Sequence, residues 1–168
     1  GAEHEPEQWN AEQRRLDALR AELRVRDAVR FLGAHDQHAL PQFYAAADIV
    51  TMPSHYESFG MAALEGLACG RPVVATSAGG PAYIVEDGVS GLHTPPDDHV
   101  ALAARLERLL ADDELRASMG AAARMRATRF GWEAVAGGML DVYTQTLERS
   151  TLACAPARTR EPVLLPRV

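Results

Sequence analysis

Short apolar runs alternate with longer amphipathic stretches along the first half of the chain. Residues 29–32, 48–52 and 72–75 are mostly apolar runs of four or five residues, which are typical of short buried strands. Residues 8–26 carry leucines at helical spacing among dense charges and predict a surface helix. Residues 40–47 predict a second helix with a proline in its first turn, where the missing N–H costs nothing. The alternation predicts an α/β fold with a parallel sheet.

The last third of the chain is predicted to be helical. Pairs of aspartates at 97–98 and 112–113 precede stretches with helical periodicity, and aspartate is a favourable N-cap residue. The first of these helices carries a leucine stripe over 102–110, and the second is expected to end at about residue 129. A third apolar stripe runs over 132–147. The stripes are most simply explained as core positions.

Composition limits the number of domains and the class of partner. The chain has 168 residues, 47% of them hydrophobic, so we expect one domain over residues 1–149 and a disordered tail over residues 150–168. The 17 basic and 23 acidic residues give a net charge of -6, which argues against nucleic acid as a partner. No run reaches the roughly 18 apolar residues of a transmembrane segment. Two cysteines outside any C-x-x-C pair predict neither a metal site nor a disulfide framework, and a cytoplasmic location fits best.

A candidate binding loop follows the predicted strand at 48–52. It places two carboxylates, Glu57 and Glu65, eight residues apart, and Gly60 between them allows the backbone to approach a bound group. A helix is expected to begin near Phe59, and its free N–H groups would favour an anion such as phosphate. Glu65 would then lie roughly 9 Å along the helix axis, similar to the reach of a diphosphate with a sugar at each end. On spacing alone, two solvated surface glutamates are the commoner explanation of this pattern.

The residues around this loop favour the binding site. The motifs D-I-V-T-M-P-S at 48–54, E-S-F-G at 57–60, E-G-L-A-C-G-R-P-V-V-A-T at 65–76 and the glycine pair at 79–80 resemble the C-terminal half of a GT-B glycosyltransferase. More narrowly, they are similar to the retaining nucleotide-sugar transferases of family 4, and the similarity extends over roughly residues 28–110. The resemblance implies a Rossmann-like parallel sheet flanked by helices, as in the C-terminal domain of a GT-B fold.

The resemblance also implies a role for each matching position. Glu57 would contact the hydroxyls of the donor sugar as the catalytic carboxylate, and Glu65 would hold the ribose. The loop after the strand at 29–32 would meet the base, which points to Ala34 and His35. The backbone that meets sugar and phosphate would come from the four residues after Glu57: Ser58, Phe59, Gly60 and Met61. Transfer would retain the anomeric configuration without a metal or other cofactor, and positive charge and a helix dipole would stabilise the departing diphosphate.

The chain departs from the family pattern in two respects. Family members carry an N-terminal domain that supplies much of the acceptor site, and a strand near the linker that ends in an Arg and a Lys; neither is visible here. We therefore expect a partial enzyme that binds a UDP-, GDP- or ADP-sugar donor but is inactive alone, with its acceptor unnamed. Peripheral membrane contact would come through the missing domain. The final helix of the family packs on that domain, so part of the stripe at 132–147 is expected to be uncovered and to promote self-association.

Several alternatives stay open. The chain could be a noncatalytic nucleotide-binding or interaction module, or a nucleotide-sugar epimerase that shares the GT-B architecture. The glycine pair at 79–80 fits either an ordinary turn or a close approach to a ligand. His55 is a candidate neighbour of the sugar, although a loop histidine is more often part of the solvated surface.

Overall fold

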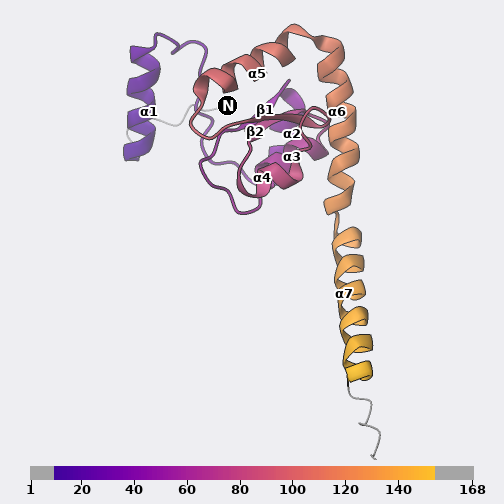
Figure 1. Cartoon of the computed structure of the whole chain (residues 1–168). Helices are drawn as coiled ribbons and strands as arrows, with labels where there is room; N and C mark the ends of the chain where they lie inside the picture. The colour runs from indigo at the N-terminus through magenta and orange to yellow at the C-terminus, as the bar shows by residue number, and fades with distance from the viewer. Residues whose placement is uncertain (1–9, 154–168) are drawn as a thin grey trace, which may run out of the picture.

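The computed structural model describes residues 10–153 of the chain, with burial of side chains described to residue 149 (Figure 1). A small parallel sheet lies at the centre, and helices surround it. In chain order the elements are α1 (Ala11–Glu22), α2 (Leu40–Ala46), β1 (Val50–Met52), α3 (Met61–Ala68), β2 (Val73–Thr76), α4 (Gly79–Ile84), β3 (Gly91–Thr94), α5 (His99–Ala111), α6 (Asp113–Ala127), a short 3-10 helix (Thr128–Phe130) and α7 (Trp132–Ala153).

The sheet has three parallel strands in the order β1-β2-β3. All four residues of the central strand β2 are buried, as its uninterrupted apolar sequence predicts. Val73 pairs with Val50 of β1 and Gly91 of β3. A side chain on Gly91 would overlap the Val73 carbonyl oxygen, so the glycine permits this pairing. The α/β fold predicted from the sequence is confirmed.

Both faces of the sheet are covered because successive residues of β2 point to opposite sides. Val73 and Ala75 belong to one buried cluster, together with Leu67 of α3 and Ile84 of α4. Val74 belongs to a second cluster, with side chains of β3, α5 and α6. Burying a large aliphatic side chain contributes about 1.5–3 kcal/mol, so these two layers fix the ends of the strands where the candidate loops begin.

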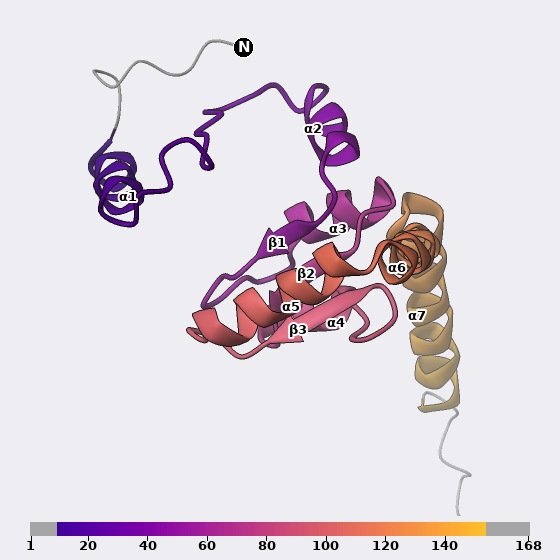
Figure 2. The same ribbon diagram turned by 90° about the horizontal axis from the view of Figure 1, so that it is seen from above.

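The strand predicted at 29–32 is wrong. No strand lies among residues 23–39, and Figure 2 shows this segment running between α1 and α2, away from the sheet. Arg20 of α1 donates a hydrogen bond to the carbonyl oxygen of Val29 (2.9 Å), and its guanidinium lies 4.8 Å from the centre of the Phe31 ring. The segment therefore contacts α1 instead of extending the sheet beyond β1, and α1 itself has no buried residue to hold it against the core.

The helical predictions for the last third are confirmed at the helix starts. The side chains of Asp98 and Asp112 accept hydrogen bonds from backbone N–H groups three residues ahead, both at 2.8 Å, and cap α5 and α6. Helix α7 continues through Ala153, past the predicted start of the tail at residue 150. The rest of that predicted tail lies outside the described residues.

Helix α7 extends away from the sheet beyond the end of α6 (Figure 1). Its apolar stripe is exposed: Trp132 is 86% exposed and Met139 is 51% exposed. The expectation that part of this stripe is uncovered is confirmed. Self-association through it stays a prediction.

Candidate functional site

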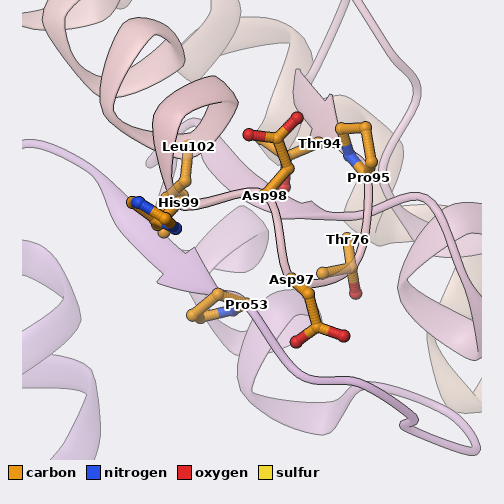
Figure 3. Close-up of a pocket in the computed structure, with 8 residues that line it drawn as sticks. All are labelled: Pro53, Thr76, Thr94, Pro95, Asp97, Asp98, His99 and Leu102. Atoms are coloured by element: carbon orange, nitrogen blue, oxygen red, sulfur yellow. The ribbon is translucent and has the colours of Figure 1, made fainter.

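The carboxyl ends of all three strands meet around a pocket of about 230 Å³ (Figure 3). Pro53 follows β1, and Thr76 and Thr94 end β2 and β3. The start of α5 closes the other side with Asp97, Asp98, His99 and Leu102, and Pro95 completes the lining. Ligands of open parallel sheets bind outside this end of the strands, so the pocket lies on the side of the sheet where a ligand is expected. Neither Glu57 nor Glu65 lines it.

Three of the polar side chains around this pocket have partners within the protein. Thr76 donates its hydroxyl to the carbonyl oxygen of Ser54 (2.7 Å), and the Asp98 carboxylate caps α5. Asp97 lies 3.1 Å from Nε2 of His55. His55 thus lies beside an acid from the loop after β3, and both side chains are largely exposed. These contacts connect the loop after β1 to the other two strand ends.

Glu57 lies in that loop, with its carboxylate at the start of α3. Its Oε1 accepts hydrogen bonds from the N–H groups of Phe59 (3.2 Å) and Gly60 (3.1 Å). A negative charge beside a helix N-terminus is stabilising by about 0.3–1 kcal/mol. The predicted position of Glu57 beside the helix terminus is confirmed, and among the described residues its Oε2 accepts no hydrogen bond. A negative group therefore already lies at the end of α3 that was expected to attract one.

The start of α3 depends on Gly60. The helix begins at Met61, two residues later than predicted, because Gly60 is the N-cap in a left-handed conformation with φ 99°. A Cβ at this position would lie 3.2 Å from Cγ of Pro81 in α4. Gly60 thus satisfies both a backbone conformation that favours glycine and a close contact with α4. The exposed side chains of Phe59 and Met61 flank it.

The glycine pair at 79–80 holds the same loop from the other side. It begins helix α4 rather than forming an open loop. The N–H of Gly80 donates to the carbonyl oxygen of Glu57 (2.8 Å). A Cβ on Gly79 would overlap the carbonyl oxygen of Glu57, and a Cβ on Gly80 would overlap that of Phe59. The structure shows a close approach of two backbone segments here, which explains the glycines without a bound group.

Glu65 lies in the middle of α3 and is half-buried. Its Oε2 accepts a hydrogen bond from the hydroxyl of Tyr44 in α2 (2.9 Å). Burial of the phenol, followed by this hydrogen bond and the charge of Glu65, raises the pKa of Tyr44 to about 12. The sequence pattern gives Tyr44 no role. Its contact with Glu65 spans 21 residues, so no local spacing pattern could have indicated it.

The predicted base-binding residues lie just before α2. Ala34 and His35 are exposed, and the His35 ring lies 4.4 Å from the ring of Phe43, centre to centre. Phe43 and Tyr44 are neighbours on α2, so this helix contacts both the segment of His35 and the carboxylate of Glu65. Helix α2 thus contacts both His35, predicted to lie beside the base, and Glu65, predicted to hold the ribose. Glu57 instead has its contacts with the backbone at the start of α3.

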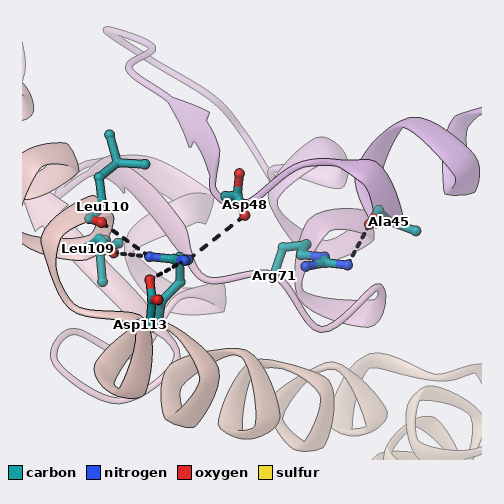
Figure 4. Close-up of polar contacts among 7 residues, drawn as sticks. Ala45, Asp48, Arg71, Leu109, Leu110 and Asp113 are labelled. Carbon is teal, nitrogen blue, oxygen red and sulfur yellow. Dashed lines mark hydrogen bonds and ion pairs between the residues drawn. The ribbon is translucent and has the colours of Figure 1, made fainter.

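Arginines make contacts near the amino ends of the strands, opposite the pocket (Figure 4). Arg116 of α6 donates to the carbonyl oxygen of Leu109 (2.8 Å) and to Asp113, and lies 3.9 Å from Asp48, just before β1. Arg71, before β2, donates to the carbonyl oxygen of Ala45 in α2. These contacts fix the amino ends of the strands and are structural.

The described part of the chain has neither a cluster of metal-binding side chains nor a helix that could span a membrane. Between residues 10 and 153, no cluster of three or more His, Cys, Asp or Glu side chains could hold a metal ion. No helix in this part of the chain is long and apolar enough to cross a membrane.

Known proteins are similar to this chain over most of its length. The family model described as glycosyl transferases group 1 matches residues 10–126. A D-inositol 3-phosphate glycosyltransferase from Xylanimonas cellulosilytica is 46% identical over 136 residues, which cover 81% of this chain and 33% of the relative. The chain therefore spans about a third of the length of the curated relatives it matches.

Solved structures share the fold. HepE from Anabaena, in complex with UDP-glucose, superposes with a TM-score of 0.72 at 30% identity, over 80% of this chain and 38% of that one. The C-terminal domain of LpcC, a glycosyl transferase group 1 family protein from Francisella tularensis, superposes with a TM-score of 0.64 at 30% identity, over 70% of this chain and 60% of that one. The predicted Rossmann-like sheet of a GT-B glycosyltransferase is confirmed.

Proposed function

This chain belongs to the glycosyl transferases group 1 family, and we propose that it forms the donor-binding, C-terminal half of a retaining GT-B glycosyltransferase of family 4. Its substrate is a nucleoside-diphosphate sugar. The observation that carries the proposal is the loop from Glu57 to Met61, which lies between the carboxyl end of β1 and the N-terminus of α3. The likeness to HepE in complex with UDP-glucose and to the C-terminal domain of LpcC supports it.

The donor's charged and polar parts match different groups of this loop and helix. Glu57 already takes the N–H groups of Phe59 and Gly60. The first N–H groups of α3, beginning with that of Met61, have no helical carbonyl to bond and would donate to the diphosphate. An ionised carboxylate only accepts hydrogen bonds, so Glu57 takes sugar hydroxyls on its Oε2. Glu65 takes the ribose hydroxyls. Ala34 and His35 lie beside the base. No metal or other cofactor takes part in this proposal.

Transfer itself requires more than this chain in our proposal. The curated relatives are about three times as long as the region they share with it. The acceptor site lies in the part of the enzyme that has no counterpart in these 168 residues. The positively charged side chains that stabilise the departing diphosphate come from that part as well. The chain alone is expected to bind a donor without transferring its sugar.

A thermal-shift panel tests donor binding. The 168-residue chain is heated with UDP, GDP, ADP and their glucose conjugates, each at millimolar concentration. A ligand present at a hundred times its Kd stabilises the native state by about 2.7 kcal/mol, which corresponds to a rise in Tm of about 5–10 °C for a chain of this size. We expect one base to give such a rise. If none of the six compounds raises the Tm, the proposed function is wrong.

Two matched variants assign the binding to the site. Glu65→Gln is expected to reduce the rise in Tm caused by the nucleotide that binds best. The substitution replaces a charged acceptor by a neutral amide, whose NH2 group cannot accept a hydrogen bond from a ribose hydroxyl. Glu107→Gln removes an exposed glutamate from α5 and should leave the shift unchanged. Equal shifts for the two variants would show that the nucleotide binds elsewhere.

A further inference from the structure

The contact between α2 and α3 carries an inference about Glu65. We propose that Tyr44 is a positioning residue for nucleotide binding: its hydroxyl holds one carboxylate oxygen of Glu65, so that the other oxygen faces the ribose hydroxyls of the donor. This inference rests on the proposed function and deepens it. Tyr44 itself does not touch the nucleotide.

The two carboxylate oxygens of Glu65 differ in their hydrogen bonds, which leaves one of them for the ribose. Tyr44 bonds Oε2 of Glu65 at 2.9 Å. Among the described residues, Oε1 accepts no hydrogen bond. A glutamate side chain has several rotamers in solution, and a bond that selects one of them before binding reduces the entropy lost when a ligand is bound. The free oxygen is therefore presented in one direction.

The surroundings of Tyr44 favour the protonated phenol, which is the form that donates this bond. Its phenol is half-buried, and burial, together with Glu65, raises its pKa to about 12. The hydroxyl consequently keeps its proton at physiological pH and remains a donor. The same short helix carries Phe43, whose ring contacts His35. A shift of α2 would therefore move the segment beside the base and the carboxylate at the ribose together.

Helix α2 does not depend on the Tyr44 hydroxyl for its place. The thiol of Cys69, at the end of α3, lies 3.9 Å from the carbonyl oxygen of Pro41. Arg71 donates to the carbonyl oxygen of Ala45 at the other end of α2 (Figure 4). Tyr44→Phe keeps the ring and both of these contacts. The variant is therefore expected to fold with α2 in place and to lose only the orienting bond.

The test compares nucleotides with and without ribose hydroxyls. Isothermal titration calorimetry of the full chain measures UDP, GDP and ADP against their 2′,3′-dideoxy forms. Tyr44→Phe is expected to weaken the bound nucleotide about five- to tenfold, the size of one net hydrogen bond, and to change the affinity of the matching dideoxy form less than twofold. Tyr83→Phe is the matched control, because the Tyr83 ring is 71% exposed. It should change neither affinity.

A double variant separates positioning from packing. In the Glu65→Gln background, Tyr44→Phe should add little to the loss for the selected nucleotide, because the charged group that it orients is gone. If Tyr44→Phe weakens the nucleotide and its dideoxy form equally, or weakens neither, Tyr44 has no positioning role. If Glu65→Gln itself leaves the affinity unchanged, the assignment of the ribose to Glu65 fails instead. Both inferences fail if wild-type chain binds none of the three nucleotides.

Discussion

Gly80 gives the sharpest test of how the loop after β1 is held. Its Cα faces the backbone of Phe59, and an added Cβ would lie well within 3.0 Å of the Phe59 carbonyl group, a separation that real Cβ atoms essentially never show. The neighbouring atoms are backbone, and Gly80 is itself bonded to the carbonyl oxygen of Glu57 at 2.8 Å. Neither side can move without breaking this hydrogen bond. Gly80→Ala must therefore displace the loop.

The expected loss of stability follows from two opposing effects. Overpacking a close contact costs about 1–3 kcal/mol, and the lost hydrogen bond adds about 1 kcal/mol. Replacing glycine by alanine restricts the unfolded chain and returns about 0.4–1 kcal/mol. The net destabilisation is about 2 kcal/mol. The displaced loop should also bind UDP, or the nucleotide that the chain prefers, at least tenfold more weakly, a difference of about 1.4 kcal/mol.

Gly137→Ala is the matched control. Gly137 lies within α7 and has nothing within 4 Å of an added Cβ, so alanine should leave the stability unchanged or raise it by up to about 1 kcal/mol. Urea unfolding measures both variants, with equal m values required for a simple comparison. If Gly80→Ala is as stable as Gly137→Ala and binds nucleotide as wild type does, the backbone contact described here does not hold the loop.

Three further predictions address the site and the scaffold. Glu57→Ala should destabilise the chain by about 1 kcal/mol, because two loop amides lose their acceptor, whereas Glu57→Gln should keep most of this stability in urea unfolding and weaken a UDP-sugar more than UDP in calorimetry. Tyr44 has a higher pKa in the folded than in the unfolded chain, so its contribution to stability is complete below about pH 10 and is lost as the pH rises towards 12; Glu65→Gln should lower the midpoint of its phenolate absorbance. Asp112→Ala should cost about 1 kcal/mol in urea unfolding, because the N–H of Leu115 loses its cap.

Local signals in the sequence predicted the elements that local contacts build. Asp98 caps α5 through an atom only three residues away, and β2 is buried because every one of its residues is apolar or small. The strand at 29–32 failed for the opposite reason. Strand pairing joins residues far apart in the chain, and Arg20 offers Val29 and Phe31 a nearer partner. Residues 29–32 therefore form no strand, and Val29 and Leu32 are exposed instead of buried.

In the candidate site, too, contacts within one turn could be predicted from the sequence and contacts between distant segments could not. Glu57 and Gly60 could be predicted because their partners lie in the same turn. The role of Tyr44 could not, because its bond to Glu65 joins two helices. The glycine pair at 79–80 was left open between a turn and a ligand contact, and only the structure shows the backbone carbonyls that require it.

These contacts together determine how much conformational entropy the loop would lose on binding the proposed donor. The loop is bonded to β2 at Ser54, to α4 at the carbonyl oxygen of Glu57, and to its own backbone through the Glu57 carboxylate. A loop that is ordered before binding loses little conformational entropy when a ligand arrives. Tyr56 is 78% exposed, and Phe59 is 42% exposed with its ring edge-to-face against Phe130. Ordering on donor binding should therefore be confined to such side chains, and amide exchange of Gly60 and Gly80 should already be slow without nucleotide. Fast exchange at these two amides would mean that the donor itself has to order the loop.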